Sequence, residues 1–252
     1  MRLSRSAYSY KTVVEDDKQI TEVLRELAHK HKRYGFRKMF CMVRRKGFSW
    51  NHKRVYRVYC SLKLNIRKKP KKRLPARDKI TLEQPNQLNI CWSLDYMSDA
   101  LMYGKRFRTV NVLDDCNREA LAIKAGISFP TRRVVEVLEE IGQEKGFPTK
   151  IRIDNGPENI SREFKKWAVS RNIKLEYIQP GKPAQNGYIE RFNRTYREEV
   201  LDMNLFRNIG EVQLLTDQWM HEYNNKRPHQ SLGNLTPKEY GEGKSFSTFG
   251  LY

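Results

Sequence analysis

The sequence predicts an α/β layer domain preceded by a small all-α domain. Residues 18 to 64 carry apolar side chains at helical spacing, whereas short apolar segments alternate with amphipathic ones from residue 90 onward. A basic segment with prolines separates the two patterns. The chain has 252 residues, of which 38% are hydrophobic, so it is long enough to supply a core for each domain.

The charge balance indicates a polyanionic partner. The chain has 49 Lys and Arg residues against 29 Asp and Glu residues, for a formal net charge of +20. Nucleic acid, an anionic membrane surface, and an acidic polysaccharide or protein all fit this charge. A membrane fits least, because no apolar run approaches the roughly 20 residues of a spanning helix and no signal peptide follows Met1. We therefore expect a soluble, intracellular protein.

The first domain should contain two or three helices, with a helix-turn-helix between Tyr34 and Leu62. Gly47 suits the left-handed turn after one helix, and Ser49 or Asn51 can cap the next. Two apolar faces are expected before this turn: Ile20, Val23, Leu24 and Leu27, and then Phe36, Phe40 and Val43.

The second helix of this pair has the pattern of a major-groove reader. Its expected DNA-facing residues are His52, Lys53, Arg54 and Arg57, around a buried set of Val55, Tyr56, Val58 and Tyr59. A basic helical hairpin that only packs against the rest of the protein is the alternative.

Residues 63 to 85 are expected to form a linker, because Pro70 and Pro75 interrupt any regular element. A solvated spacer is one interpretation, and a segment that follows DNA phosphates is the other. The DNA-contacting residues expected here are Lys68, Lys69, Lys71, Lys72 and Arg73. The predicted division is thus 1–62 for the helical domain, 63–85 for the linker, 86–245 for the α/β domain and 246–252 for a tail.

Five strands and three helices are expected in the α/β domain. The strands are predicted at 90–97, 107–113, 120–125, 150–153 and 173–178, and the short connections between the first three predict an antiparallel meander. Helices are expected from 161 to 172 and from near Gly187. Another should begin at a Thr131 cap and bury one face, composed of Val134, Val135, Leu138 and Ile141. The order βββαβαβα is typical of α/β layers.

Three acidic residues are candidates for the chemistry. Asp95 interrupts an apolar strand, Asp154 ends another, and Glu190 lies in the helix that starts near Gly187. Taken singly, each is more simply a turn former or a helix cap. Together, two strand-end aspartates and a helical glutamate can converge at one edge of a sheet and offer the oxygen ligands that Mg²⁺ requires.

Other acids are weaker candidates for the same role. Asp99 and Asp114 could each replace Asp95 as the first metal ligand, although hydrogen bonding at a turn or strand end explains both. Glu158 follows Asp154 too closely to replace Glu190 and is expected in a loop or at a helix start.

The motifs around these acids carry a family resemblance. Between Asp154 and Glu190 lie 35 residues, which matches the D,D(35)E signature of transposases and retroviral integrases. The segments WSLDYMSDAL, IRIDNGPE, IQPGKPAQNGYIERFNRTYREE and YNNKRPHQSLGNLTP resemble the second reading frame of IS3-family insertion-sequence transposases. The resemblance extends from about Tyr34 to Pro237.

This resemblance implies a ribonuclease-H-like integrase core, with a mixed five-stranded sheet flanked by helices. It implies that Asp95, Asp154 and Glu190 are both catalytic residues and ligands of two Mg²⁺ or Mn²⁺ ions per site. The activity would be DNA cleavage at transposon ends, followed by attack of the freed 3′ hydroxyl on target DNA. The expected partners are double-stranded DNA, further copies of the chain on that DNA and the upstream reading-frame product, in the nucleoid of a bacterial cytoplasm.

Residues beside the glutamate are expected to contact DNA. Lys182, Gln185 and Asn186 lie in the loop before its helix, and Arg194 and Arg197 follow Glu190 at i+4 and i+7. An ion pair of Arg194 with Glu190 or Glu198 is the alternative. A further segment, 219–229, is interpreted as a helix with an aromatic packing face and a proline stop, where Arg227 and His229 could also touch DNA.

No structural zinc is expected. His29, His31, Cys41 and Cys60 are too widely spaced for a zinc module. The four cysteines contain no CxxC pair, so we expect reduced, structural thiols.

Two other functions compete with the transposase. A DNA-binding regulator or architectural protein would use the charge and the helix-turn-helix but would not need the three acids. An RNase-H-like nuclease acting on RNA:DNA hybrids would share the fold and the metals but would lack strand transfer.

Overall fold

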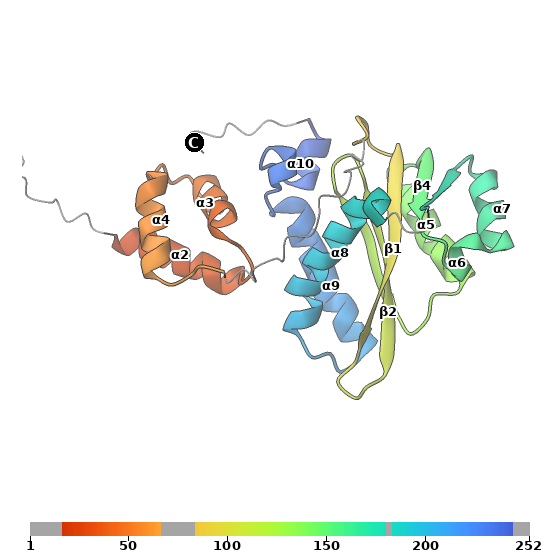
Figure 1. The fold of residues 1–252 in the computed structure, drawn as a ribbon, viewed down its shortest axis with the longest axis horizontal. Coiled ribbons are helices and arrows are strands. Elements are labelled where there is room, and N and C mark those ends of the chain that lie inside the picture. Colours follow the sequence, from red (N-terminus) through yellow and green to blue (C-terminus); the bar gives the residue numbers. More distant parts are fainter. Residues whose placement is uncertain (1–16, 67–83, 180–182, 244–252) are drawn as a thin grey trace, which may run out of the picture. The chain divides into compact units, whose positions relative to one another are not determined.

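The computed structural model describes residues 17–66, 84–179 and 183–243, which belong to two separate units (Figure 1). The first unit is helical and the second is built on a sheet. The expected DNA contacts at Lys68, Lys69, Lys71, Lys72, Arg73 and Lys182 lie outside the described residues.

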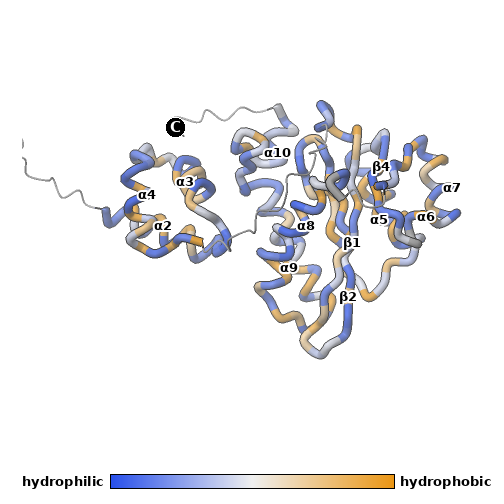
Figure 2. The backbone as a smooth tube through the Cα atoms, viewed as in Figure 1, coloured by the Kyte–Doolittle hydropathy of each residue, from blue (hydrophilic) through white to orange (hydrophobic). Residues whose placement is uncertain are grey.

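Three helices form the small unit: α2 (Lys18–Lys30), α3 (Phe36–Arg45) and α4 (His52–Ser61). Their inward faces build a core that includes Leu24, Val43 and Val55, each fully buried. In Figure 2 hydrophilic and hydrophobic residues alternate along α2 and α4, as expected of helices with one buried side. The predicted all-α region is confirmed.

The turn between α3 and α4 follows the predicted chemistry. Gly47 adopts φ +88°, and the N–H of Phe48 donates to the carbonyl of Val43 at 3.3 Å, which closes the end of α3. The side chain of Asn51 accepts from the N–H of Lys53 at 2.8 Å and caps α4. Of the two candidate caps, Asn51 is therefore the one used.

The prediction that Tyr56 is buried was wrong. Its side chain is 48% exposed, whereas Val55, Val58 and Tyr59 are buried. Tyr56 lies at the edge of the buried stripe of α4, where its ring contacts Phe36 edge-on at 4.7 Å between ring centroids. Neighbouring residues of a helix point about 100° apart, and the stripe that buries Val55, Val58 and Tyr59 leaves Tyr56 on its exposed side.

A mixed five-stranded sheet organises the second unit, in the order β3-β2-β1-β4-β5. Its strands are β1 (Cys91–Ala100), β2 (Arg106–Asp114), β3 (Ala120–Gly126), β4 (Lys150–Ile153) and β5 (Lys174–Tyr177). The first three pair antiparallel as predicted, whereas β4 pairs parallel to both β1 and β5. The predicted mixed sheet is confirmed.

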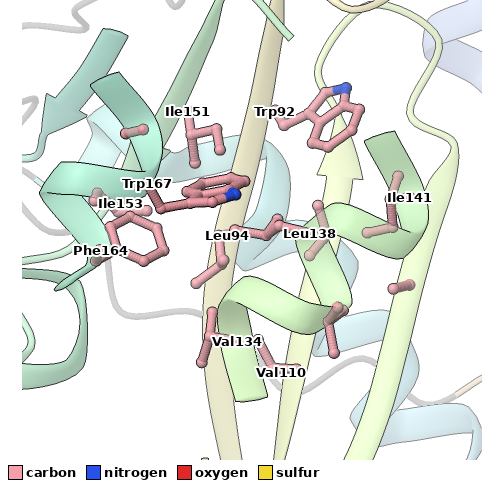
Figure 3. Close-up of a cluster of buried hydrophobic side chains, with 14 of the residues drawn as sticks. Trp92, Leu94, Val110, Val134, Leu138, Ile141, Ile151, Ile153, Phe164 and Trp167 are labelled. Carbon is pink, nitrogen blue, oxygen red and sulfur yellow. The ribbon is translucent and has the colours of Figure 1, made fainter. Parts of the chain in front are cut away.

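Helices cover both faces of this sheet. On one face α5 (Thr131–Lys145) and α7 (Arg162–Ser170) enclose a core around Trp92, Leu94 and Phe164 (Figure 3). On the other face α8 (Gly187–Glu199) and α9 (Ile209–Asn225) pack onto a second core. Shorter helices complete the unit: α6 (Pro157–Ile160), α10 (Pro237–Gly241), and the 3-10 turns Pro183–Asn186, Leu201–Met203 and Gln230–Leu232.

The start of α5 differs from the prediction. Pro130, with an extended backbone, occupies the cap position and Thr131 is the first helical residue. The hydroxyl of Thr131 therefore does not cap the helix but donates to Ser161 Oγ at 3.1 Å. Val134, Leu138 and Ile141 are buried as expected, and the fourth buried apolar side chain of this face is Val137, since Val135 is only partly covered.

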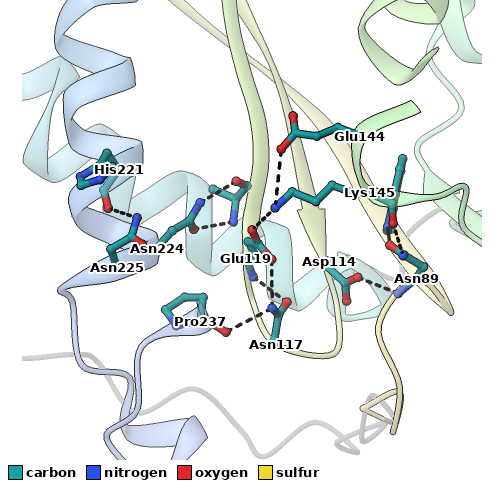
Figure 4. Close-up of polar contacts among 12 residues, drawn as sticks. Asn89, Asp114, Asn117, Glu119, Glu144, Lys145, His221, Asn224, Asn225 and Pro237 are labelled. Carbon is teal, nitrogen blue, oxygen red and sulfur yellow. Dashed lines mark hydrogen bonds and ion pairs between the residues drawn. The ribbon is translucent and has the colours of Figure 1, made fainter. Parts of the chain in front are cut away.

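Amide side chains of α9 satisfy the outer strand β3. Asn224 accepts from the N–H of Ala120 and donates to its carbonyl, both at 2.9 Å (Figure 4). Gln213 in the same way accepts from Ala125 N–H at 2.8 Å and donates to Ile123 carbonyl at 3.0 Å. Edge strands expose unpaired backbone groups, and these two amides cover part of that edge.

Within the described residues, no helix is long and apolar enough to cross a bilayer.

Candidate active site

Asp95 and Asp154 both follow the paired part of two neighbouring strands. β1 and β4 are parallel, and Asp95 and Asp154 each lie two residues beyond the last paired position, Ser93 opposite Arg152. Side chains two apart on a strand share a face, so the carboxylate of Asp95 extends on the side of Ser93. That side is the one covered by α8, because Met97, the next residue of this face, packs in the core with α8.

Asp95 is half-buried and accepts two hydrogen bonds. Its Oδ1 accepts from the N–H of Tyr96 at 2.8 Å, and its Oδ2 accepts from Nδ2 of Asn193 at 2.7 Å. Burial raises the pKa of Asp95 to about 6, the two donors oppose that rise, and the nearby charges of Asp154 and Glu190 add to it. Asp154 and Glu190 thus lie close enough to Asp95 to disfavour its charge.

Asn193 joins the helix that carries Glu190 to the strand that carries Asp95. Its Oδ1 accepts from Nδ2 of Asn111, the residue opposite Asp95 on β2, at 2.7 Å. This bond fixes which end of the Asn193 amide faces Asp95, because a carboxylate can only accept. Asn193 is 7% exposed, so this chain of amides is shielded from water.

Asp154 follows the end of β4 and is held by the next turn. Its Oδ1 accepts from the N–H of Gly156 at 3.0 Å and from Nδ2 of Asn159 at 2.7 Å. Asn159 lies in α6, next to Glu158, for which a loop or a helix start was expected. The carboxylate is therefore oriented by donors on one of its two oxygens.

Glu190 lies in the first turn of α8, where a negative charge is favoured by the helix dipole. Its side chain is exposed, while Ile189, Phe192 and Tyr196 point into the core from the same helix. In this conformation Glu190 acts on Asp95 through its charge, which raises the pKa of Asp95. Among residues 17–66, 84–179 and 183–243, no three His, Cys, Asp or Glu side chains are grouped closely enough to hold a metal ion together.

The weaker acidic candidates have structural partners. Asp114 is buried and accepts from the N–H groups of Asn89 at 2.9 Å and Cys116 at 2.8 Å. Asp99 accepts from the N–H of Ala100 at 2.7 Å and binds Arg197 at 3.1 Å. Both therefore make the turn and strand-end hydrogen bonds that the sequence suggested for them.

The chain resembles insertion-element proteins over most of its length. Two models described as "Integrase core domain" match residues 85–183 and 171–237, and a model described as "HTH-like domain" matches residues 15–73. The insertion element IS407 uncharacterized 31.7 kDa protein of Burkholderia multivorans is 35% identical over 94% of this chain and 86% of its own length. The chain belongs to the IS3 family of DDE transposases.

Two further comparisons agree with this family. The putative transposase InsK for insertion sequence element IS150 of Escherichia coli is 25% identical over 94% of this chain and 89% of its own. A chain of the simian T-cell lymphotropic virus intasome in complex with PP2A regulatory subunit B56 gamma has a TM-score of 0.56 at 15% identity, covering 90% of this chain and 76% of that one. The predicted integrase-type fold is confirmed, and as a DDE transposase the protein is a polynucleotidyl transferase that acts on DNA.

Of the two α8 arginines expected to contact DNA, one is exposed and the other binds a carboxylate. Arg194 is exposed, and within the described residues no ion pair joins it to Glu190 or Glu198. Arg197 instead binds Asp99 and donates to the carbonyl of Ser98 at 2.9 Å.

Before that helix, Gln185 accepts from the N–H of Gln179 at 2.9 Å and thereby connects the two sides of the loop. Asn186 is 4% exposed at the start of α8, and its buried Oδ1 has no hydrogen-bond partner among the described residues.

The basic residues of α4 also differ from one another. Lys53 and Arg57 are exposed and His52 is half-buried, whereas Arg54 is half-buried and donates to Asp17 at 2.9 Å. Arg57 also lies 3.0 Å from Asp17. Lys53 is therefore the clearest candidate on this helix for contact with a phosphate.

The segment 219–229, which includes the end of α9, packs as the sequence suggested. The rings of Trp219 and Tyr223 pack against Phe192, and Pro228 follows the helix end. Arg227 is 6% exposed and its guanidinium binds the carboxylate of Glu199. This burial assigns Arg227 to the core of the transposase rather than to its DNA-facing surface.

Sequence reasoning missed the asparagines that hold the two aspartates. Asn193 lies three residues after Glu190, so helical spacing placed it on the same side of α8, but nothing in the sequence indicated that this side faces β1. Asn159 carried no signal, because an asparagine shortly after Asn155-Gly156-Pro157 is equally typical of a turn.

The cysteines are free thiols: Cys41, Cys91 and Cys116 are buried and Cys60 is half-buried. Burial raises the pKa of the Cys91 thiol far above its ordinary value, and Asp115 beside it acts in the same direction. The Cys91 thiol is therefore packed in the structure as a protonated, unreactive group.

Proposed function

We propose that this transposase cleaves DNA strands at the ends of an insertion sequence and joins the freed 3′ ends to target DNA, using Asp95, Asp154 and Glu190. The observation that supports the proposal is that Asp95 and Asp154 each lie two residues beyond the last paired position of the parallel strands β1 and β4. The influence of both other acids on the pKa of Asp95 supports Glu190 as the third member.

The residues fit a site for divalent cations. They offer carboxylate oxygens, the donor type that Mg²⁺ and Mn²⁺ prefer, and burial together with like charge makes ionised Asp95 unfavourable without a counterion. Two such ions per site would supply charge neutralisation at the attacking and leaving oxygens of a phosphodiester.

Each step exchanges one P–O bond for another. In cleavage a water oxygen bonds to phosphorus and gives up a proton, the bond to the 3′ oxygen breaks, and that oxygen takes up a proton. In strand transfer the 3′ oxygen bonds to a target phosphorus, loses its proton to solvent, and the broken target strand leaves with a free 3′ hydroxyl. The protein itself orients Asp95 and Asp154 and holds the reacting phosphate in line with the attacking and leaving oxygens.

The basic surfaces would hold the DNA. Arg194, exposed one turn after Glu190, is suited to bind the phosphates next to the scissile bond. The loop before α8 would contact the DNA beside the active site through Lys182, Gln185 and Asn186. We assign terminal-repeat recognition to residues 1–62, phosphate contact to the linker 63–85, and catalysis to 86–245, with 246–252 as a tail. Strand transfer needs two transposon ends held together, so a dimer or larger assembly on DNA is part of the proposal. The upstream reading-frame product would be a further partner.

Cleavage of a labelled duplex that carries the element's ends, with Mg²⁺ or with EDTA, tests the site. Asp154→Asn and Glu190→Gln should abolish nicking while preserving DNA binding. Glu198→Gln is the matched control, because Glu198 is an exposed glutamate on the same helix, and it should nick normally. Nicking by Asp154→Asn at the wild-type rate would refute the proposed site and leave a protein that only binds DNA.

A further inference from the structure

Asp154 is oriented by a buried side chain that takes no part in the proposed chemistry. Asn159 is fully buried in α6, and its Nδ2 donates to Asp154 Oδ1 at 2.7 Å. Burying a polar side chain costs free energy unless its polar groups are hydrogen-bonded. The hydrogen-bond partners of Asn159 therefore indicate the role of the residue.

The orientation of the Asn159 amide is set by Tyr96. The hydroxyl of Tyr96 lies 3.1 Å from Asn159 Oδ1 and donates to it, because the other end of the amide must present its N–H to the acceptor-only carboxylate of Asp154. A second tyrosine, Tyr177, donates to the backbone carbonyl of Asn159 at 3.0 Å and does not contact its side chain amide. One tyrosine therefore fixes the amide and the other fixes the backbone.

The hydrogen bonds to Asp154 are one-sided. Asn159 Nδ2 and Gly156 N–H both donate to Oδ1, and in the described part of the chain no donor is bound to Oδ2. An oxygen with two donors has little capacity left for a cation, whereas Oδ2 keeps its lone pairs. This arrangement selects which oxygen of Asp154 is offered to the site.

Tyr96 also contacts the other aspartate. Its backbone N–H donates to Asp95 Oδ1 at 2.8 Å, while its hydroxyl reaches Asp154 through Asn159. The ring itself packs at the edge of the core that contains Leu94 and Phe164, so the hydroxyl is held in place by packing. One rigid residue on β1 thus relates the orientations of both carboxylates.

We propose that Asn159 and Tyr96 are positioning residues that turn Asp154 so that its Oδ2 faces the bound cation. This inference rests on the proposed function, since it assumes that Asp154 is a metal ligand. Partners that orient metal ligands commonly contribute a factor of about 10 to 100 in metal affinity or activity.

The test is Mn²⁺ binding to the full chain without DNA, followed by calorimetry, together with the Mg²⁺ concentration that gives half-maximal nicking. Asn159→Ala should weaken Mn²⁺ binding roughly 10-fold or more, and Tyr96→Phe should weaken it by about 3-fold to 10-fold. Tyr177→Phe is the matched control, because it removes a hydroxyl that bonds the same residue at its backbone, and it should change the affinity less than about twofold. High Mg²⁺ should restore nicking by both positioning variants, which a loss of fold would not allow.

Asp154→Asn distinguishes a failure of the proposed metal site from a failure of the positioning role alone. If it binds Mn²⁺ as wild type does, Asp154 is not a ligand and the proposed function fails together with this inference. If it loses Mn²⁺ while Asn159→Ala and Tyr96→Phe bind normally, the positioning role alone is overturned. Should Asn159→Ala not fold in a thermal unfolding assay, Tyr96→Phe decides, since it keeps the packed ring.

Discussion

Asn193 on α8 donates a 2.7 Å hydrogen bond to Oδ2 of Asp95 on β1, across 98 positions of sequence. The bond joins the helix that carries Glu190 to the strand that carries the first aspartate. Its amide is in turn oriented by Asn111 at 2.7 Å. The relative placement of Asp95 and Glu190 therefore depends on side chains that do not themselves react.

Asn193→Ala should lower the nicking rate by about 10-fold to 100-fold, because Asp95 loses its oriented donor and α8 loses a contact to the strand. Thr195→Ala, a change on the same helix at a residue that bonds only its own helix backbone, is the control and should be near neutral. Rates are measured at saturating DNA alongside thermal unfolding. A wild-type rate for Asn193→Ala would show that α8 is positioned by its apolar contacts alone.

The stability of the metal-free protein should depend on pH through Asp95. Its pKa of about 6 lies above the ordinary value of 3.8, so its contribution to stability is complete below about pH 4 and is lost as the pH rises through 6. At about 1.4 kcal/mol per pH unit, the loss is at most roughly 3 kcal/mol. Urea unfolding in EDTA from pH 4 to 8 should show this fall in wild type and not in Asp95→Asn.

Added Mg²⁺ should reverse that fall. Cation binding requires ionised Asp95, so Mg²⁺ should raise the unfolding temperature more at pH 7.5 than at pH 5. Equal stabilisation at both pH values would mean that the cation binds elsewhere.

Asn224→Ala should destabilise the transposase by about 1 to 3 kcal/mol, because it removes two hydrogen bonds to Ala120. It also exposes backbone groups of β3, so self-association should increase in light scattering. Asn225→Ala is the control on the same helix, since its amide bonds only the carbonyl of His221, and it should do neither. Equal effects of the two substitutions would contradict a specific role in covering the edge strand.

Lys53 and Arg54 should have different effects on DNA binding. Lys53→Ala should weaken binding to all sequences and lower the slope of log affinity against log salt by about one unit, as expected for a lost phosphate contact. Arg54→Ala should mainly lower the stability of the small unit, since Arg54 is half-buried against Asp17. Fluorescence anisotropy at several salt concentrations, with thermal unfolding beside it, distinguishes the two.

Local patterns were enough for much of the fold. Apolar spacing located α2, α3 and α4, the three meander strands and α8, because side-chain periodicity reports which side of an element faces water. It did less well at boundaries: Tyr56 sits at the edge of a buried stripe, and Pro130 displaced Thr131 from the cap of α5.

The sequence by itself determined the polyanionic partner, the mixed α/β order and the three acids worth testing, since charge, periodicity and motif spacing are properties of the linear chain. Only the tertiary structure decided that Asn193 binds Asp95, that Asn159 and Tyr96 orient Asp154, and that Arg197 and Arg227 bind carboxylates instead of remaining free. The physical reason is that a hydrogen bond between side chains depends on strand register and helix rotation. These are fixed by the packing of the whole domain, and Tyr96 and Asn159, 63 positions apart, carry no mark of each other in the sequence.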